Sequence, residues 1–185
     1  MSTISAFTQI SIDGYFAGPN GEIDWFKSID RDDEYDKYTH QSAQSRNTLL
    51  MGRTTYEMMK SFWPTEQARQ MDPHMASVMN ESPKVVVSKS LKNADDWNNV
   101  RILREIARDE IEKLKRENDV TILGSGSIVQ QLTNHGLIDE YHLVHIPVVL
   151  GAGKSLFSDV QKKKLELRES KSFANGIVVT KYNPR

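Results

Sequence analysis

Residues 120–157 read VTILGSGSIVQQLTNHGLIDEYHLVHIPVVLGAGKSLF, and their pattern predicts the architecture of the chain. A β-branched run at 120–123 ends at a glycine turn, 124–126, and apolar residues then recur at helical spacing as far as Gly136. A second apolar run covers 141–150. A strand, a glycine turn, a helix and another strand form a crossover unit, which requires a parallel or mixed sheet covered by helices.

The glycine turn in this unit predicts half of a nucleotide site. Glycines let a ligand approach the backbone, and the following helix presents unpaired N–H groups and a positive dipole end, which suit phosphate. Two sharper motifs do not match. A dinucleotide fingerprint needs a glycine at 129, and a P-loop ending in GAGKS at 151–155 needs one at 148, but both positions are valine. Tight turns without any ligand are the alternative.

Composition narrows the class of protein. The 185 residues carry a net charge of −1 and no cysteine, which argues against nucleic-acid binding, a disulfide framework and thiolate or zinc–thiolate chemistry. No apolar stretch approaches membrane-spanning length, and the N-terminus lacks the pattern of a secretory signal. His142 and His145 are three apart on a predicted strand and face opposite sides, so no metal site is predicted. We expect one cytoplasmic domain, 1–185, without a membrane partner.

A loop rich in turn residues follows the first predicted strand. Residues 3–12 alternate as a strand does, and DGYFAGPNG then occupies 13–21 with two aromatic residues among its glycines. A glycine-rich loop of this length in a compact domain is typically a binding loop or a lid.

Two carboxylates and two aromatic residues close this loop. In EIDWF, Glu22 and Asp24 stand beside Trp25 and Phe26. A carboxyl group that aromatic neighbours desolvate has a raised pKa and can donate a proton. The alternative is that both carboxylates only cap the next helix.

A second strand-to-helix junction predicts another anion pocket. The buried run NTLLM at 47–51 continues into GRTT at 52–55, and helix-compatible residues 56–60 follow. A glycine, a guanidinium and two hydroxyls at such a junction suit an anion, whereas an exposed Arg53 at an ordinary helix start is the alternative.

The remaining pattern completes a mixed α/β count of seven or eight strands and four helices. Further strands are predicted at 84–88 and 97–103, helices at 31–45, 65–80 and 103–117, and a closing antiparallel hairpin from 165–173 and 177–182.

Four stretches occur in the order seen in dihydrofolate-reductase-like proteins: SIDGYFAGPNGEIDWF, LLMGRTTYE, KVVVSKSL and LGSGSIVQQLTNHGLIDEYHLVHIPVVLGAGKSLF. The chain most resembles stand-alone members of one branch, which is typified by the C-terminal reductase domain of the bacterial bifunctional deaminase-reductase of riboflavin synthesis. The resemblance covers nearly the whole chain. It implies a three-layer fold, with a mixed, mainly parallel sheet of about eight strands flanked by helices, and NADPH as the cofactor.

The resemblance also implies a role for particular residues. The cofactor phosphates are expected at Gly52, Arg53, Thr54 and Thr55, and the pyrophosphate and nicotinamide ribose at Gly124, Ser125, Gly126 and Ser127. The adenosine end is expected at Ser88 and Lys89, with Arg53 and Lys89 as candidates for the 2′-phosphate. The mobile loop 13–21 closes over nicotinamide and substrate, and the substrate is expected to contact Asp13, Tyr15, Trp25 and Phe26.

The implied reaction is hydride transfer to a C=N bond of a pterin, folate or ribosylaminopyrimidine-like substrate. Glu22 matches the acidic residue that binds the pteridine ring, and Asp24 is the near alternative as proton donor. The chain departs from the riboflavin enzyme at Leu123, where that enzyme has an acidic residue, and it has no deaminase motif. An NADP(H)-binding protein without turnover is therefore the second hypothesis. Relatives often dimerise, so a homodimer is possible.

Overall fold

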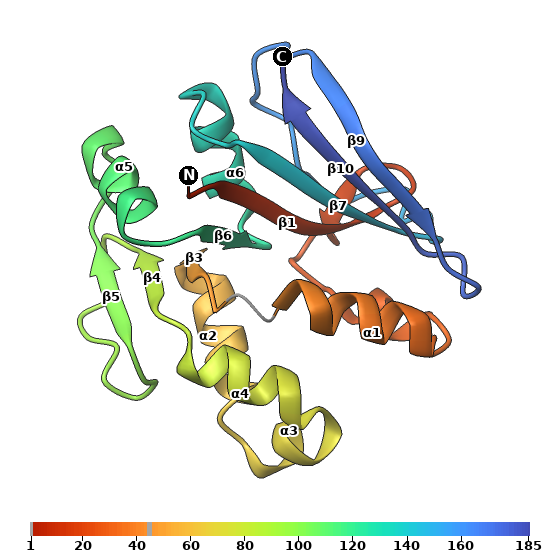
Figure 1. Cartoon of the computed structure of the whole chain (residues 1–185), viewed down its shortest axis with the longest axis horizontal. Helices are drawn as coiled ribbons and strands as arrows, with labels where there is room; N and C mark the ends of the chain where they lie inside the picture. Colours follow the sequence, from red (N-terminus) through yellow and green to blue (C-terminus); the bar gives the residue numbers. More distant parts are fainter. Residues whose placement is uncertain (1, 44–45) are drawn as a thin grey trace.

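A mixed sheet organises the computed structural model, which describes residues 2–43 and 46–185 (Figure 1). Eight strands lie in the order β5-β4-β3-β6-β1-β7-β10-β9. Neighbours from β5 to β7 are parallel, and β10 is antiparallel to both β7 and β9. This arrangement confirms the predicted fold class. The strands are β1 (Ile4–Ser11), β3 (Thr48–Gly52), β4 (Lys84–Val87), β5 (Val100–Leu103), β6 (Val120–Leu123), β7 (Glu140–Ile146), β9 (Leu165–Ser172) and β10 (Val178–Pro184).

The predicted crossover unit is present at the centre of the sheet. It consists of β6, the helix α6 (Gly126–Asn134) and β7, and β1 lies between its two strands with Phe7 opposite both Leu123 and His142. The second strand ends earlier than the predicted 141–150, because Pro147 lacks the N–H that would continue the ladder.

Helices cover both faces of the sheet in three layers. The helices besides α6 are α1 (Asp33–Ser42), α2 (Arg53–Phe62), α4 (Pro73–Glu81) and α5 (Arg108–Glu117), with a further short helix described below. Leu50 packs with residues of α5 and α6, whereas its neighbours Leu49 and Met51 pack with α2 and α4 on the other face, as alternation along a strand requires. The helix α1 covers the second face near β7 and β10, where Tyr35 and Tyr38 pack in a third cluster.

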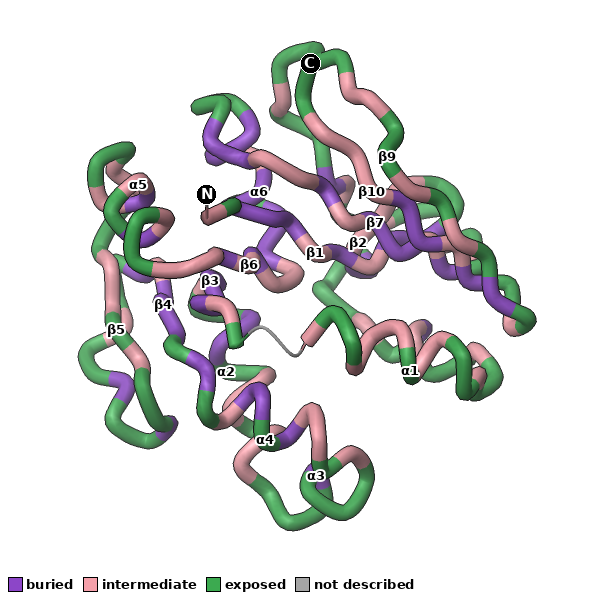
Figure 2. Tube along the Cα trace, viewed as in Figure 1, coloured by how far each residue is buried: buried purple, intermediate pink, exposed green. Residues whose placement is uncertain are grey.

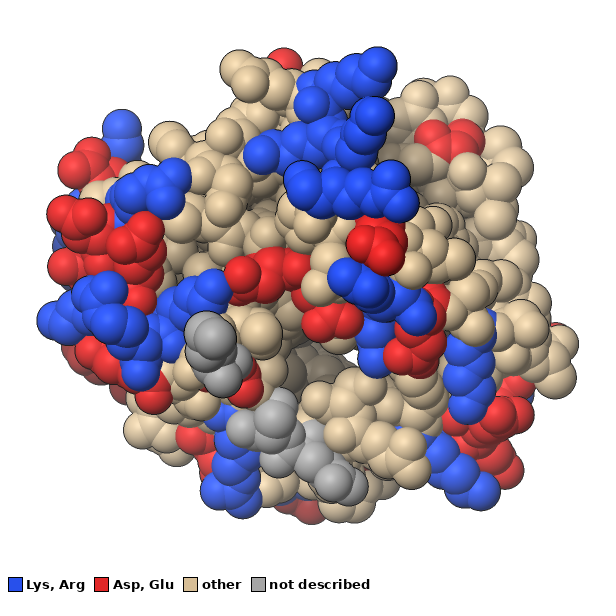
Figure 3. All heavy atoms as spheres, turned by 45° about the horizontal axis from the view of Figure 1, so that its top comes forward, with Lys and Arg blue, Asp and Glu red and all other residues tan. Residues whose placement is uncertain are grey.

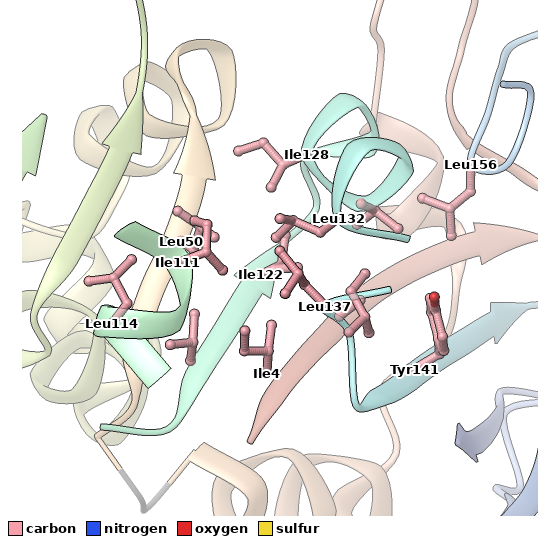
Figure 4. Packing of buried hydrophobic residues seen from close by; sticks show 14 of the residues in the cluster. Ile4, Leu50, Ile111, Leu114, Ile122, Ile128, Leu132, Leu137, Tyr141 and Leu156 are labelled. Carbon is pink, nitrogen blue, oxygen red and sulfur yellow. The ribbon is translucent and has the colours of Figure 1, made fainter. Parts of the chain in front are cut away.

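The core is centred on β1, β3 and β6. Figure 2 shows β1 and β3 buried along most of their length, and Figure 4 shows Ile4, Leu50 and Ile122 facing Leu132 of α6. Within the described part of the chain, no helix combines the length and apolarity needed to cross a bilayer.

Helix bounds differ from the sequence-based prediction in three places. The segment 65–80 forms two helices, α3 (Glu66–Met71) and α4, because Asp72 leaves helical geometry with φ −149° and caps α4 through Met75 N–H at 3.0 Å. The helix expected at 103–117 begins at Arg108, since Leu103 belongs to β5. The helix expected at 31–45 ends at Ser42, and positions 44 and 45 lie outside the described residues.

A small second sheet holds the glycine-rich loop against the end of the crossover unit. It pairs β2 (Tyr15–Ala17) with β8 (Lys154–Ser155) in antiparallel fashion. The loop therefore lies beside the carboxyl end of β1 and close to α6.

Candidate functional site

A cleft of about 930 Å³ opens at the carboxyl ends of the parallel strands. This is the edge at which open α/β sheets bind ligands, and the volume suits a ligand of cofactor size. Its walls come from residues far apart in sequence: 7–9, 16–17, 21, 23, 26, 52–55, 58–59, 87–89, 104–106, 123–128, 131 and 154.

The two predicted anion pockets meet in this cleft. Gly52 N–H donates a hydrogen bond to Ser125 Oγ at 2.8 Å, and the hydroxyl of Thr55 lies 2.9 Å from the same oxygen. Ser125 is buried, so the contact joins the start of α2 to the start of α6. All eight residues expected at the two junctions line the cleft: Gly52, Arg53, Thr54, Thr55, Gly124, Ser125, Gly126 and Ser127.

Glycine is required at Gly126 because an aromatic ring of the loop lies against it. A Cβ added there would stand 2.4 Å from Cε1 of Phe16. Gly124 needs glycine for another reason, since its φ of +53° is left-handed and no atom lies within 4 Å of its Cβ position. The turn is thus shaped both by its backbone and by the loop that covers it.

Basic side chains gather at the end of the cleft formed by β4 and β5. Ser88 and Lys89 lie there as expected, together with Arg104, which no sequence motif indicated. Arg104 Nη1 donates to the carbonyls of Ser88 at 3.2 Å and Leu91 at 2.5 Å, which fixes the turn after β4. Arg104 directly follows the parallel strand β5, and a residue at the carboxyl end of a predicted parallel strand is a candidate for the cleft.

Arg53 reaches the same end from α2. Its Nη1 donates to Ser90 Oγ at 2.9 Å, and its Nε pairs with Glu57 at 2.7 Å. Glu105 is the one carboxylate that lines the cleft within the described residues. This end therefore carries a net positive charge.

Aromatic rings line the opposite end of the cleft, beside β1. Phe7, Phe16 and Phe26 contribute to this wall, and Thr8 and Gln9 of β1 add polar groups. Of the four residues expected to contact substrate, Phe26 lies here. Trp25 is buried outside the cleft, 4.2 Å from the Phe26 ring between centroids, and packs toward β7 and β10.

Asp13 and Tyr15 do not line the cleft but anchor the loop beside it. The carboxylate of Asp13 accepts hydrogen bonds from Ser11 Oγ at 2.6 Å and from the N–H groups of Gly151 at 2.7 Å and Leu150 at 3.2 Å. The Ser11 hydroxyl, followed by these backbone donors, lowers the pKa of Asp13. Tyr15 pairs with Ser155 in the small sheet.

Glu22 and Asp24 also lie outside the cleft wall. Glu22 is exposed and accepts hydrogen bonds from Asn20 through its N–H at 2.9 Å and its Nδ2 at 2.6 Å. The side-chain hydrogen bond from Asn20 is the main cause of a lowered pKa for Glu22, which keeps this carboxyl group ionised at neutral pH. Asp24 is exposed in the first turn of a short 3-10 helix, η1 (Asp24–Ser28).

The family follows from comparison with known proteins. Residues 2–179 match the RibD C-terminal domain. The chain belongs to this family. Its members include reductase-like proteins, so the match confirms the resemblance drawn from the sequence motifs.

Relatives and solved structures agree with this assignment. The chain is 28% identical to the uncharacterized protein YyaP of Bacillus subtilis (strain 168) over 177 residues, which cover 94% of this chain and 90% of YyaP. A Shewanella sp. PV-4 protein assigned provisionally to riboflavin biosynthesis superposes with a TM-score of 0.78 at 23% identity, covering 99% of both chains. Dihydrofolate reductase from Enterococcus faecalis, complexed with NADP(H) and RAB-propyl, gives 0.66 at 17% identity, covering 99% of this chain and 96% of that one.

Proposed function

We propose that this protein is an NADPH-dependent reductase of a pterin, folate or ribosylaminopyrimidine-like substrate. The observation that carries the proposal is the direct contact between Gly52 and Ser125, which brings two helix starts to one cleft. Membership of a reductase-like family supports the same conclusion.

The donor set of the cleft fits a phosphorylated dinucleotide. Two helix starts and their hydroxyls suit a pyrophosphate, and Gly124 leaves open space where a larger residue would place a side chain. Lys89, Arg53 and Arg104 form a cationic end suited to a further phosphate. When bound, the reduced nicotinamide would supply a hydride.

The residues beside β1 would hold the ring that accepts the hydride. Phe7, Phe16 and Phe26 offer apolar faces for a planar heterocycle and exclude water from it. Phe16 lies on the loop 13–21 and contacts the glycine turn at Gly126. The loop would therefore hold the heterocycle close to the nicotinamide.

The proton would come from water at the mouth of the cleft, and neither Glu22 nor Asp24 would deliver it directly. The exposure of both carboxylates and the lowered pKa of Glu22, caused mainly by Asn20, support this choice. Glu22→Gln and Asp24→Asn test it, because a direct donor is typically worth about 10²–10⁴-fold in rate. We expect turnover within about threefold of the parent for both variants. A loss of about 10²-fold in either variant would show that the substituted carboxyl group is the proton donor.

The proposed activity is tested by following NADPH absorbance with dihydrofolate and, separately, with a ribosylaminopyrimidine of the riboflavin pathway. We expect oxidation that requires both the protein and one of these substrates. A second candidate function, NADP(H) binding without turnover, is favoured by Leu123, which lines the cleft where the riboflavin enzyme has an acidic residue. Tight NADPH binding without oxidation by either substrate would support that candidate.

A further inference from the structure

One face of α6 carries a glycine and two side-chain amides at helical spacing. Gly126, Gln130 and Asn134 follow one another at intervals of four residues, so they lie on the same side of the helix. Gly126 lies against the Phe16 ring of the loop 13–21, and the two amides contact the segment that follows β7. This face of α6 therefore contacts two segments that are distant in sequence.

Gln130 holds β8 through hydrogen bonds from a single amide nitrogen. Its Nε2 donates to the carbonyls of Ser155 at 3.2 Å and Leu156 at 3.1 Å, and to the hydroxyl of Ser158 at 3.2 Å. Leu156 is buried in the same core cluster as Leu132 of α6, and Figure 4 shows it beside that helix. Polar and apolar contacts thus fix this part of the segment to α6.

Asn134 holds a later part of the same segment. Its Nδ2 donates to the carbonyl of Asp159 at 2.8 Å, and its Oδ1 accepts from the N–H of Gln161 at 3.0 Å. Both partners come after β8, which ends at Ser155. Of these two amides, Gln130 is therefore the one that contacts the strand paired with the loop.

The loop that carries Phe16 lies directly against β8. The N–H of Leu156 donates to the carbonyl of Gly14 at 3.4 Å, and β8 pairs with β2 in antiparallel fashion. The two backbones approach so closely at Gly153 that an added Cβ would collide with the carbonyl oxygen of Ala17. Because Phe16 directly precedes Ala17, a displacement of β8 would also move the Phe16 ring.

We infer that Gln130 is a positioning residue, which holds β8 in place and thereby sets the position of the Phe16 ring over the glycine turn. Gln130 does not line the cleft, so it would act through β8 and β2 and not by contact with a ligand. The consequence for catalysis rests on the proposed function. If Phe16 holds the heterocycle close to the nicotinamide, displacing the ring should lower turnover while coenzyme affinity is retained.

Fluorine NMR of protein labelled with 4-fluorophenylalanine tests the position of the ring without any ligand. Gln130→Met keeps the approximate length of the side chain and removes the donor. We expect this variant to shift or broaden the Phe16 resonance, which is assigned with Phe16→Leu. The resonances of Phe62 at the end of α2 and of Phe173 after β9 should stay unchanged.

Hydrogen exchange gives a second readout of the same contact. Exchange at the Leu156 amide should become about tenfold faster in Gln130→Met, as expected when a hydrogen bond that fixes the segment is lost. The Ser82 amide donates to the Val78 carbonyl at the end of α4, far from β8, and serves as the reference. Its exchange rate should not change.

Two further variants separate the donor from packing. Gln130→Lys keeps N–H donors on a side chain of similar reach, so most of the parent's Phe16 resonance and Leu156 exchange rate should return. Asn134→Leu is the matched control, because it removes an amide of the same face whose partners lie outside β8. Both readouts should stay as in the parent.

Four results would overturn the inference: an unchanged Phe16 resonance in Gln130→Met, the same effect from Gln130→Lys, the same effect from Asn134→Leu, or equal acceleration at the Leu156 and Ser82 amides. The last result would mean that Gln130 contributes only to global stability.

Kinetic measurements connect the inference to the proposed reductase. Gln130→Met should lower kcat about tenfold or more and change the Kd for NADP⁺ by less than about twofold. Equal losses of turnover and NADP⁺ affinity would overturn the positioning role. If the parent oxidises NADPH with neither heterocycle, the proposed reductase is refuted, and the Phe16 and Leu156 measurements still decide the role of Gln130.

Discussion

Gly126 shows how one absent side chain can govern the site. Its backbone is not left-handed, so alanine is acceptable locally, but a Cβ would meet the Phe16 ring at 2.4 Å. We expect Gly126→Ala to cost about 1–3 kcal/mol in unfolding free energy, measured by urea denaturation, as overpacking does. The double variant Phe16→Ala/Gly126→Ala should therefore be nearly as stable as Phe16→Ala alone, because the ring that crowds the new methyl group is gone.

Gly124→Ala is the matched comparison for this prediction. Here the strain lies in the positive φ of +53°, and no neighbour crowds the new methyl group. Phe16→Ala should therefore not relieve the cost of Gly124→Ala. If Phe16→Ala reduced the stability cost of both glycine substitutions equally, the contact with the Phe16 ring would not be the specific cause at Gly126.

Lys84 gives a prediction about pH. Its side chain is 1% exposed and donates to the carbonyls of Ser82 at 2.7 Å and Asn80 at 3.2 Å, and burial lowers its pKa to about 8 from 10.5. The unfolded chain therefore binds more protons between these two pH values, so Lys84 contributes increasing stability as the pH rises from about 8 to 10.5.

The measurement is urea unfolding across that pH range, with Lys84→Met as the reference chain. The parent should gain up to about 3 kcal/mol more than the variant between the two ends of the range. Parallel pH profiles for the two chains would show that Lys84 does not titrate there.

Among the structural elements, the loop 13–21 depends on a short anchor. Asp13 accepts from Gly151 N–H at 2.7 Å, and the Ser11 hydroxyl helps to lower the pKa of this carboxyl group. Asp13→Ala should speed hydrogen exchange at the Gly151 amide, measured by NMR, while Asp24→Ala leaves it unchanged. The contact should persist above pH 3.8 and be lost as the pH falls through the lowered pKa. An unchanged exchange rate in Asp13→Ala would show that Asp13 does not anchor the loop.

The break between α3 and α4 depends on Asp72. One oxygen of its carboxylate accepts from Met75 N–H at 3.0 Å, and the other lies 2.8 Å from His40 Nε2 on α1. Asp72→Ala should lower the unfolding free energy by about 1–2 kcal/mol, and Asp72→Asn by less, because asparagine also caps helices. Thermal denaturation compares the two variants, and equal losses would show that the cap is not the dominant contribution.

The local sequence pattern predicts individual helices, strands and turns better than it predicts which of them lie side by side in the folded protein. The junctions at Gly52 and Gly124 could be recognised because strand, turn and helix signals are contiguous in sequence. Arg104 and Lys154 could not, because their place in the cleft depends on the order of strands in the sheet. Glu22 does lie beside Trp25, whose indole N–H donates to the Glu22 carbonyl at 3.3 Å, but the Trp25 ring packs toward β7 and β10 and leaves the Glu22 carboxylate exposed.

Across the whole molecule, charge is distributed without a dominant sign. Figure 3 shows acidic and basic side chains interspersed over much of one face, which agrees with the net charge of −1. Coenzyme selection would therefore depend on local cations in the cleft and not on a global field.

Lys89 and Arg104 should set the coenzyme preference. They reach the same end of the cleft from the segments after β4 and β5. Lys89→Gln and Arg104→Gln should each reduce the preference for NADPH over NADH by about tenfold or more, because each removes a charge-assisted contact with a phosphate. Calorimetric titration of both coenzymes measures this ratio. A uniform loss for both coenzymes would contradict the assignment of these side chains to the 2′-phosphate.

The position of β1 also has a consequence for biosynthesis. This strand is translated well before its parallel partners β6 and β7, with Ile4 opposite Val120 and Ser5 opposite Glu140. Contacts over such separations are slow to form. During synthesis both edges of the β1 backbone therefore stay unpaired in the main sheet until β6 and β7 have emerged, and during that interval the strand is exposed to chaperones.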